Sequence, residues 1–236
     1  PPVDTRGVST GDSIAISEYN AALRTVRRFV RVFEQLGTAE SVRVWFPDSG
    51  EADIAVHGAG INPASGQWEQ EAEFDDWNGG VDALLGGDVV TKLSLLSQGY
   101  ATGGSLKSGV ADEVQTDDRL YVIAYPYESD DELIAAMELW ETEWARRPML
   151  FVNGGLDTAR SRWSAPWASK AKRMREEFLP RVEAAFYLHE FRSQAGGGML
   201  LRAYPGPWRV LRRDPAGGYV CVEETDERPE LRDVAL

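Results

Sequence analysis

The stretch Asp118–Gly155, DRLYVIAYPYESDDELIAAMELWETEWARRPMLFVNGG, decides the fold because its hydrophobic period changes twice. The apolar run Leu120–Tyr125 is typical of a buried strand. A helix follows it, capped near Ser129 or Asp130, and the run after Pro148 has the composition of a second buried strand. This order of strand, helix and strand predicts two parallel strands joined by a crossover.

The region before this stretch predicts the same kind of architecture. Apolar residues recur every three or four positions over Ile14–Leu36, which predicts an amphipathic helix with Ser17 as its N-cap and Gly37 as its stop. A short strand at Val42–Phe46 and a helix capped by Ser49 come next. The other side of the first helix is either a solvated polar face or a surface for an anionic partner, and it carries Arg24, Arg27, Arg28 and Arg31.

The C-terminal part has a different rhythm. After a basic helix over Ala168–Phe178, short apolar runs alternate with turns rich in glycine and proline, which predicts an antiparallel meander. The predicted strands are Val182–Phe191, Met199–Tyr204, Trp208–Arg212 and Tyr219–Glu223. We therefore predict an α/β fold with a mixed sheet, a parallel βαβ part followed by this meander, and helices packed on the sheet.

No boundary in the sequence is sharp enough to divide the chain, so we predict a single α/β domain over residues 1–236. The segment His57–Val114 differs from the rest because short apolar runs stand among many Gly, Asp, Glu and Ser residues. We expect one helix, one strand and long loops in this insert-like segment.

Charge and hydropathy exclude several classes of protein. The 236 residues carry a formal net charge of -13, and such a field repels phosphate. This charge argues against general affinity for nucleic acid or anionic membranes, and only a local basic patch could override it. No stretch of about 20 apolar residues is present, so we expect no transmembrane segment and a protein that is soluble or peripheral to a membrane. A chain that opens with Pro1 rather than Met also leads us to expect that a leader has been removed.

Residue chemistry offers no catalytic set, metal site or cofactor motif. Cys221 is the single cysteine, and its alternation with valines predicts packing in a strand rather than a reactive thiol. His57 and His189 are far apart in the sequence, so neither forms a His/Cys cluster, and a structural role is the better interpretation of both. The acidic run WEQEAEFDDW lacks the spacing of a calcium loop and is better interpreted as solvated.

Two polar residues follow predicted strands at their carboxyl ends. Asp48 and Asn153 take the positions where α/β sheets carry ligand-binding groups, and they are candidates for one cleft. The structural interpretation has equal or greater weight, since Asp and Asn after strands also form turns and cap helices.

The segment Leu156–Arg181 reverses the charge of the chain, with seven basic and three acidic side chains. Tryptophans among basic residues are typical of surfaces that are buried on association. This segment is a candidate partner surface, although tryptophans that anchor a helix with solvated charges explain the same pattern. The candidate residues are Trp163, Trp167, Lys170 and Arg173.

The C-terminal motifs provide the clearest functional indication. The run LLRAYPGPWRV contains a rigid corner formed by Arg202 and Tyr204–Trp208, which is either structural or part of a binding surface. Arg202, Tyr204 and Trp208 are candidate binding residues, and Asp48 is one candidate partner for the charge of Arg202. Together with FPDSGEADIA, RLYVIAYPY, RPMLFVNGGLD, EAAFYLHEF and YVCVEETDERPELRDV, this corner resembles the plastid and cyanobacterial family called domain of unknown function 1995.

The resemblance covers about residues 14–236 and diverges over 57–114, and Gly154-Gly155 stands where the family more often has proline after asparagine. The family includes the Low Photosystem II Accumulation protein 3 type and a domain fused behind a plastid adenylate kinase. The resemblance implies a non-enzymatic chloroplast protein, in the stroma or peripheral to the thylakoid, that assists photosystem II assembly. Its implied partner is a photosystem subunit or the thylakoid insertion machinery, and its implied leader is a transit peptide.

Two alternatives remain open at this point. The α/β order, the two strand-end residues and the fusion to a kinase are also consistent with a nucleotide- or ligand-binding enzyme or sensor. A resident auxiliary subunit of a photosynthetic complex would share the implied location but would occur in a fixed ratio to its partners.

Overall fold

In the computed structural model of the chain, the crossover predicted from the sequence is present. Strand β5 (Leu120–Ala124), helix α4 (Asp130–Glu143) and strand β6 (Met149–Val152) follow one another, and β5 pairs with β6 in parallel. The structure describes residues 11–61, 68–86, 114–126, 129–143, 147–162, 168–193 and 196–234.

Four parallel strands form the first sheet. Its order is β4-β1-β5-β6, with β1 (Val42–Asp48) paired to β4 (Gly80–Leu85) on one side and to β5 on the other. Every residue of β1 is buried, as expected for a parallel strand covered on both faces.

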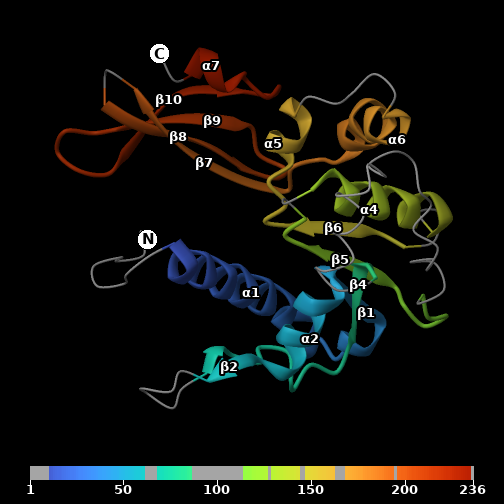
Figure 1. Cartoon of the computed structure of the whole chain (residues 1–236). Helices are drawn as coiled ribbons and strands as arrows, with labels where there is room; N and C mark the ends of the chain where they lie inside the picture. The colour runs from blue at the N-terminus through green and yellow to red at the C-terminus, as the bar shows by residue number, and fades with distance from the viewer. Residues whose placement is uncertain are drawn as a thin grey trace. The chain divides into compact units, whose positions relative to one another are not determined.

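Helices cover both faces of this sheet, because alternate residues of each strand point to opposite faces. Val44 and Phe46 of β1 share one hydrophobic cluster with residues of α1 (Gly11–Gln35) and α2 (Ser49–His57). Trp45 points the other way and packs with residues of β5 and α4. The result is three layers, with α1 and α2 on one face of the sheet and α4 on the other (Figure 1).

Helix α1 confirms the predicted amphipathic helix and corrects its start. It begins at Gly11, so Ser17 lies inside the helix and is not the N-cap. Gly37 stops it as predicted, with a φ of 67°. The amide of Gly37 donates to the carbonyl of Glu34 and that of Thr38 to Phe33, the paired bonds that commonly end a helix.

The rest of this part of the chain is built from short elements. The predicted basic helix is present as α6 (Ser169–Arg173), which continues into a turn of π-helix, η3 (Met174–Phe178). The remaining short elements are η1 (Ala39–Ser41), β2 (Ala59–Ile61), β3 (Trp68–Gln70), α5 (Leu156–Ser161) and η4 (Leu179–Arg181). Three strands, β2, β3 and β4, therefore lie in the segment 57–114, where one was expected, and residues 87–113 lie outside the described part.

The four C-terminal strands confirm the predicted antiparallel meander. Their order is β10-β9-β8-β7, and a short helix, α7, follows. The elements are β7 (Phe186–Ser193), β8 (Gly196–Ala203), β9 (Trp208–Arg213), β10 (Tyr219–Thr225) and α7 (Leu231–Val234). The α/β class and both kinds of strand pairing are as predicted, but the parallel strands and the meander form separate sheets, and β2 pairs with β3 in a third, two-stranded antiparallel sheet.

The parallel sheet and the meander belong to two different compact units. Unit 1 comprises residues 1–179 and unit 2 comprises residues 180–236. Unit 2 has a hydrophobic core of its own, in which Leu200, Trp208 and Val210 of the sheet pack with Val234 of α7. Because each strand of the meander pairs with its neighbour in sequence, unit 2 needs no strand from unit 1 to complete its sheet.

Candidate functional site

The order of the parallel sheet places a topological switch point between β1 and β5. The chain leaves β1 through α2 toward β4 on one side, and it leaves β5 through α4 toward β6 on the other. Open α/β sheets bind ligands at the carboxyl ends of the strands beside such a point, and the order here is that of flavodoxin-like folds. A ligand site is therefore expected at the carboxyl ends of β1 and β5, the carboxyl edge of the sheet.

Asp48 lies at this edge as the last residue of β1, but its carboxylate already has a structural role. Its side chain is in the N-cap of α2, where Oδ1 accepts a hydrogen bond from the backbone N of Glu51 at 3.0 Å. Asp48 is only 8% exposed. The capping interpretation of Asp48 is confirmed, and the prediction that Ser49 caps this helix is wrong.

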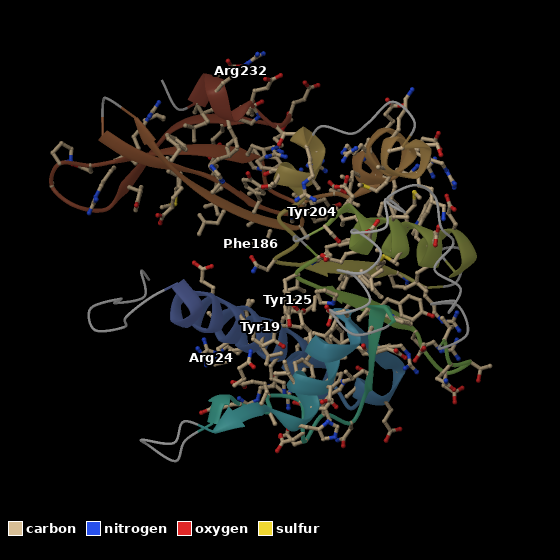
Figure 2. All side chains as sticks on the ribbon, in the orientation of Figure 1. Tyr19, Arg24, Tyr125, Phe186, Tyr204 and Arg232 are labelled. Atoms are coloured by element: carbon tan, nitrogen blue, oxygen red, sulfur yellow. The ribbon has the colours of Figure 1, made fainter. Side chains whose placement is uncertain are left out.

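An aromatic cluster that the sequence analysis did not single out lies beside Asp48. Tyr125 follows β5 with a φ of 32°. The centroid of its ring lies 5.9 Å from that of Phe46 and 6.0 Å from that of Tyr19, and both contacts are edge-to-face. The hydroxyl of Tyr19 donates to the backbone carbonyl of Glu51 at 3.3 Å. Figure 2 shows Tyr19 and Tyr125 side by side at this edge. The Tyr-Pro pair that follows β5 was the available sequence signal.

Asn153 lies at the same edge but apart from Asp48. It follows β6, is exposed and has a φ of 56°, a conformation that asparagine adopts more readily than most residues. Strand β5 separates β6 from β1, so the two strand ends are about 10 Å apart. The edge therefore brings the two predicted residues into one region without direct contact.

Carboxylates of the chain itself occupy the helix N-termini at this edge. Asp130 begins α4 and accepts hydrogen bonds from Arg162 at 3.1 Å and from Arg175. Ser129 donates to Glu132 in the first turn of the same helix at 3.0 Å. Bound phosphate requires helix N-termini that are open to an anion. The acidic first turns of α2 and α4 disfavour a nucleotide here.

The predicted corner in unit 2 is held together by stacking and one ion pair. Arg202 lies directly opposite Trp208 in the β8–β9 pairing, with its guanidinium carbon 5.2 Å from the Trp208 ring centroid. The guanidinium carbon of Arg228 also lies near the Trp208 ring, 5.4 Å from its centroid, and 4.8 Å from the centroid of the Tyr187 ring. Trp208 is buried in the core of unit 2, whereas Tyr204 is exposed. Of the three predicted residues, Tyr204 is thus the most accessible to a partner.

Arg202 has its acidic partner within unit 2. Its Nη2 donates to Oε1 of Glu183 at 3.0 Å. Asp48, the candidate partner named from the sequence, belongs to unit 1, where its carboxylate caps α2. Glu183 precedes β7 in a loop, so alternation along the strands gave no signal for this pair.

The basic segment predicted as a partner surface directs its charges toward α4. Lys170 donates to Glu138 at 2.7 Å, and Arg173 forms an ion pair with Glu141. Both basic residues are on α6 and both acidic residues on α4, so these contacts join two helices of unit 1. The two predicted tryptophans, Trp163 and Trp167, lie outside the described residues.

Apolar side chains form a row on one face of the meander, exposed on β7 and half-buried on β8 and β9. Phe186 and Leu188 of β7 are 69% and 52% exposed. Leu188 lies opposite Leu201, and Met199 lies opposite Leu211, so these side chains share one face. We call this the outer face and define it by Phe186, Leu188, Met199, Leu201 and Leu211.

Cys221 belongs to the same face because it lies opposite Leu211 in the β9–β10 pairing. It is exposed, so the expectation of packing in the core is wrong. Strand alternation correctly put Cys221 in an apolar row, but no helix of unit 2 covers that row in the described structure.

The described residues contain no group of three or more His, Cys, Asp or Glu side chains that could hold a metal ion. His57 pairs with Asp53 at 2.9 Å on the exposed side of α2, and His189 stacks on Tyr187. Among the helices that the structure describes, none is both long and apolar enough to cross a membrane.

Comparison with known proteins identifies the family. Residues 4–236 match the family described as domain of unknown function (DUF1995), so the chain belongs to that family. No curated protein and no solved structure matches the chain.

Proposed function

We propose that this member of the DUF1995 family is a non-enzymatic binding protein that assists photosystem II assembly in the chloroplast. Its partner is a photosystem subunit or the thylakoid insertion machinery, and it works in the stroma or at the thylakoid surface. The outer face of unit 2 is the observation that carries this proposal, together with the sequence motifs described above.

The outer face has the character of a binding surface. An antiparallel sheet usually packs one apolar face on the core and presents a polar face to water. Here the inner face packs on α7, yet the outer face still presents Phe186 and Leu188 to solvent. Contiguous exposed apolar side chains mark interaction sites, since their exposure has a cost that binding removes.

Charged side chains on the outer face can fix the orientation of a bound partner. Leu201 lies opposite Arg209 in the sheet, and Arg209 forms an ion pair with Glu224 at 2.9 Å. An apolar centre beside charged groups is the usual anatomy of a protein interface. A segment of an unassembled membrane subunit that is apolar with a polar end would place its apolar part on the apolar side chains and its polar end near Arg209 and Glu224.

The test is purification of the tagged chain from gently solubilised chloroplasts, with native gels and mass spectrometry of the eluate. We expect substoichiometric photosystem II subunits or insertase components with the wild type, and their loss with F186S/L188S. The control is V220S, which changes an exposed apolar residue of β10 that lies opposite Arg212, on the other face of the sheet. Equal recovery with F186S/L188S and V220S would remove the outer face from the proposal.

A fixed ratio to a mature complex would instead identify a resident auxiliary subunit. A chain that elutes alone would contradict both forms of the proposal.

A second candidate function, binding of a small ligand or nucleotide, is favoured only by the switch point between β1 and β5. The chain's own carboxylates at the α2 and α4 N-termini oppose it. Titration calorimetry with ATP, ADP and NAD tests this alternative, and we expect no heat of binding.

A further inference from the structure

Helix α1 carries an exposed ridge of cations beside an exposed ridge of apolar side chains. Arg24, Arg28 and Arg31 are exposed and are spaced by four and three residues, so they line one side of the helix. The ridge from Arg24 to Arg31 is about 10 Å long. It lies away from the core, which contains Leu23 and Val26 of the same helix.

The apolar ridge runs parallel to the cationic one. Phe29, Val32 and Leu36 have the same three- and four-residue spacing and are 40%, 42% and 67% exposed. These side chains do not belong to the hydrophobic core that α1 forms with the parallel sheet. The outer side of α1 is therefore itself amphipathic, with both ridges open to solvent.

The arginines of the cationic ridge form no ion pair within the described part of the protein. Arg27, on the flank, donates to Glu34 at 2.8 Å and to Asp76 at 2.8 Å, so these two acidic side chains are paired with Arg27 rather than with the ridge. None of the ion pairs among the described residues involves Arg24, Arg28 or Arg31. Asp76 lies near Arg31 as well, but it is hydrogen-bonded to Arg27.

We propose that this outer side of α1 docks on a bilayer surface that contains anionic lipid. Arginines beside apolar side chains on one helix fit the membrane interface, where guanidinium groups reach phosphates while apolar groups enter the acyl boundary. An anionic bilayer presents phosphates beside acyl chains everywhere on its surface, whereas a protein partner would need an acidic strip and an apolar strip spaced to match the two ridges. The attraction is local, because the whole chain with its charge of -13 is repelled by the same surface.

This docking does not depend on the partner proposed for unit 2, since all six side chains belong to unit 1. It adds a means by which the chain reaches a membrane, in the absence of any described helix that could span one.

The test is flotation of the full chain with vesicles of phosphatidylcholine alone or with about one third of phosphatidylglycerol. We expect binding to the anionic vesicles only, and weaker binding as salt rises. R24Q/R28Q/R31Q should lower the partition constant about a hundredfold, because each basic residue near an anionic surface contributes about fivefold. F29A/L36A should also lower it.

The matched control is R119Q/K172Q/R232Q, which makes the same change in net charge at exposed positions elsewhere. We expect it to bind within about twofold of the wild type, because Debye screening limits distant charges. Circular dichroism of each variant checks folding.

Equal binding to neutral and anionic vesicles, no binding by the folded wild type, or equal losses in both triple variants would overturn the proposal. Capture by an acidic polypeptide without vesicle binding would assign the ridge to a protein partner instead, and would also overturn it.

Discussion

The two four-stranded sheets of this protein differ in how they are covered. Helices lie on both faces of the parallel sheet of unit 1, and every residue of β1 is buried. The meander of unit 2 has a core on its inner face, while Phe186 and Leu188 on its outer face are open to solvent. Apolar residues in the first sheet therefore contribute to stability, whereas those on the outer face of the second are available for binding.

Polar side chains lie at both ends of the strands of the parallel sheet, which are called here its amino and carboxyl edges. At the amino edge, buried Arg43 donates to buried Asp118 at 2.8 Å, and Arg147 donates to the backbone carbonyl of Asp118 at 2.7 Å. At the carboxyl edge, Asp48 caps α2. Polar groups at both ends of the parallel strands thus hold the fold together.

The largest expected effect comes from comparing two phenylalanines. Phe46→Ala removes a fully buried ring from the parallel sheet and should lower the free energy of unfolding by about 3–5 kcal/mol. Phe186→Ala, on the outer face, should change it by no more than about 0.5 kcal/mol. Urea unfolding followed by fluorescence and circular dichroism measures both. A loss of several kcal/mol from Phe186→Ala would show that the outer face is part of a core.

The buried ion pair at the amino edge should give the next largest effect. Asp118→Asn leaves the charge of Arg43 buried with Asp82, at 3.3 Å, as its remaining acidic partner, and should cost about 3 kcal/mol. Asp117→Asn, at the exposed neighbouring position, is the control and should be close to neutral. If thermal melting shows the same small shift for both variants, the pair does not hold this edge.

Substitutions of Asp48 should have a smaller effect on stability, and they distinguish a helix-capping role of its carboxylate from a binding role. Asp48→Ala should lower the stability by about 1 kcal/mol, while Asp48→Asn should nearly preserve it, because Asn and Asp cap helices about equally well. Both variants should capture partners like the wild type at matched folded concentration. Loss of capture with Asp48→Asn, in a protein of unchanged melting temperature, would give the carboxylate a functional role.

The smallest effect concerns the exposed ion pair beside α1. The hydrogen bond from Arg27 holds the pKa of Asp76 below its ordinary value. In Arg27, burial acts to lower the pKa, but the hydrogen bonds to Glu34 and Asp76 outweigh it, so the pKa is raised. The Asp76 contribution is present above the unfolded-state pKa of Asp76 and is lost as the pH falls through its lower folded-state pKa.

Melting temperatures of the wild type and Asp76→Asn from neutral to acid pH test this linkage. The wild type should be slightly more stable at neutral pH, and the two should converge in acid. The difference should be small because the Asp76 side chain is 75% exposed and solvent screens the pair. A difference that grows toward low pH would have the wrong sign for this account.

Local signals made much of the fold predictable from sequence. The change from a strand pattern to a helix pattern and back predicted the β5–α4–β6 crossover, and Gly37 predicted the end of α1 through its left-handed conformation. Turns rich in glycine and proline predicted the meander. In each case, neighbouring residues alone determine the feature.

The features that depend on distant partners were not predictable in this way. Periodicity indicates that a strand has an apolar face but not what covers it, so the division into two sheets and the exposure of Cys221 were missed. The ion pair between Arg202 and Glu183 joins a strand to a loop, and the pair between Lys170 and Glu138 joins two helices. Charge alone does not specify such pairs.

The most direct test of the central claim is site-specific photocrosslinking from the outer face in chloroplasts. A benzoylphenylalanine at position 186 should give an adduct with a photosystem II subunit or insertase component, identified by mass spectrometry. The same probe at the exposed position 172 of α6 should not. Adducts with those proteins from position 186 alone are the predicted result. Crosslinks from position 186 only within the chain itself, or none, would contradict the claim that this face binds an assembly partner.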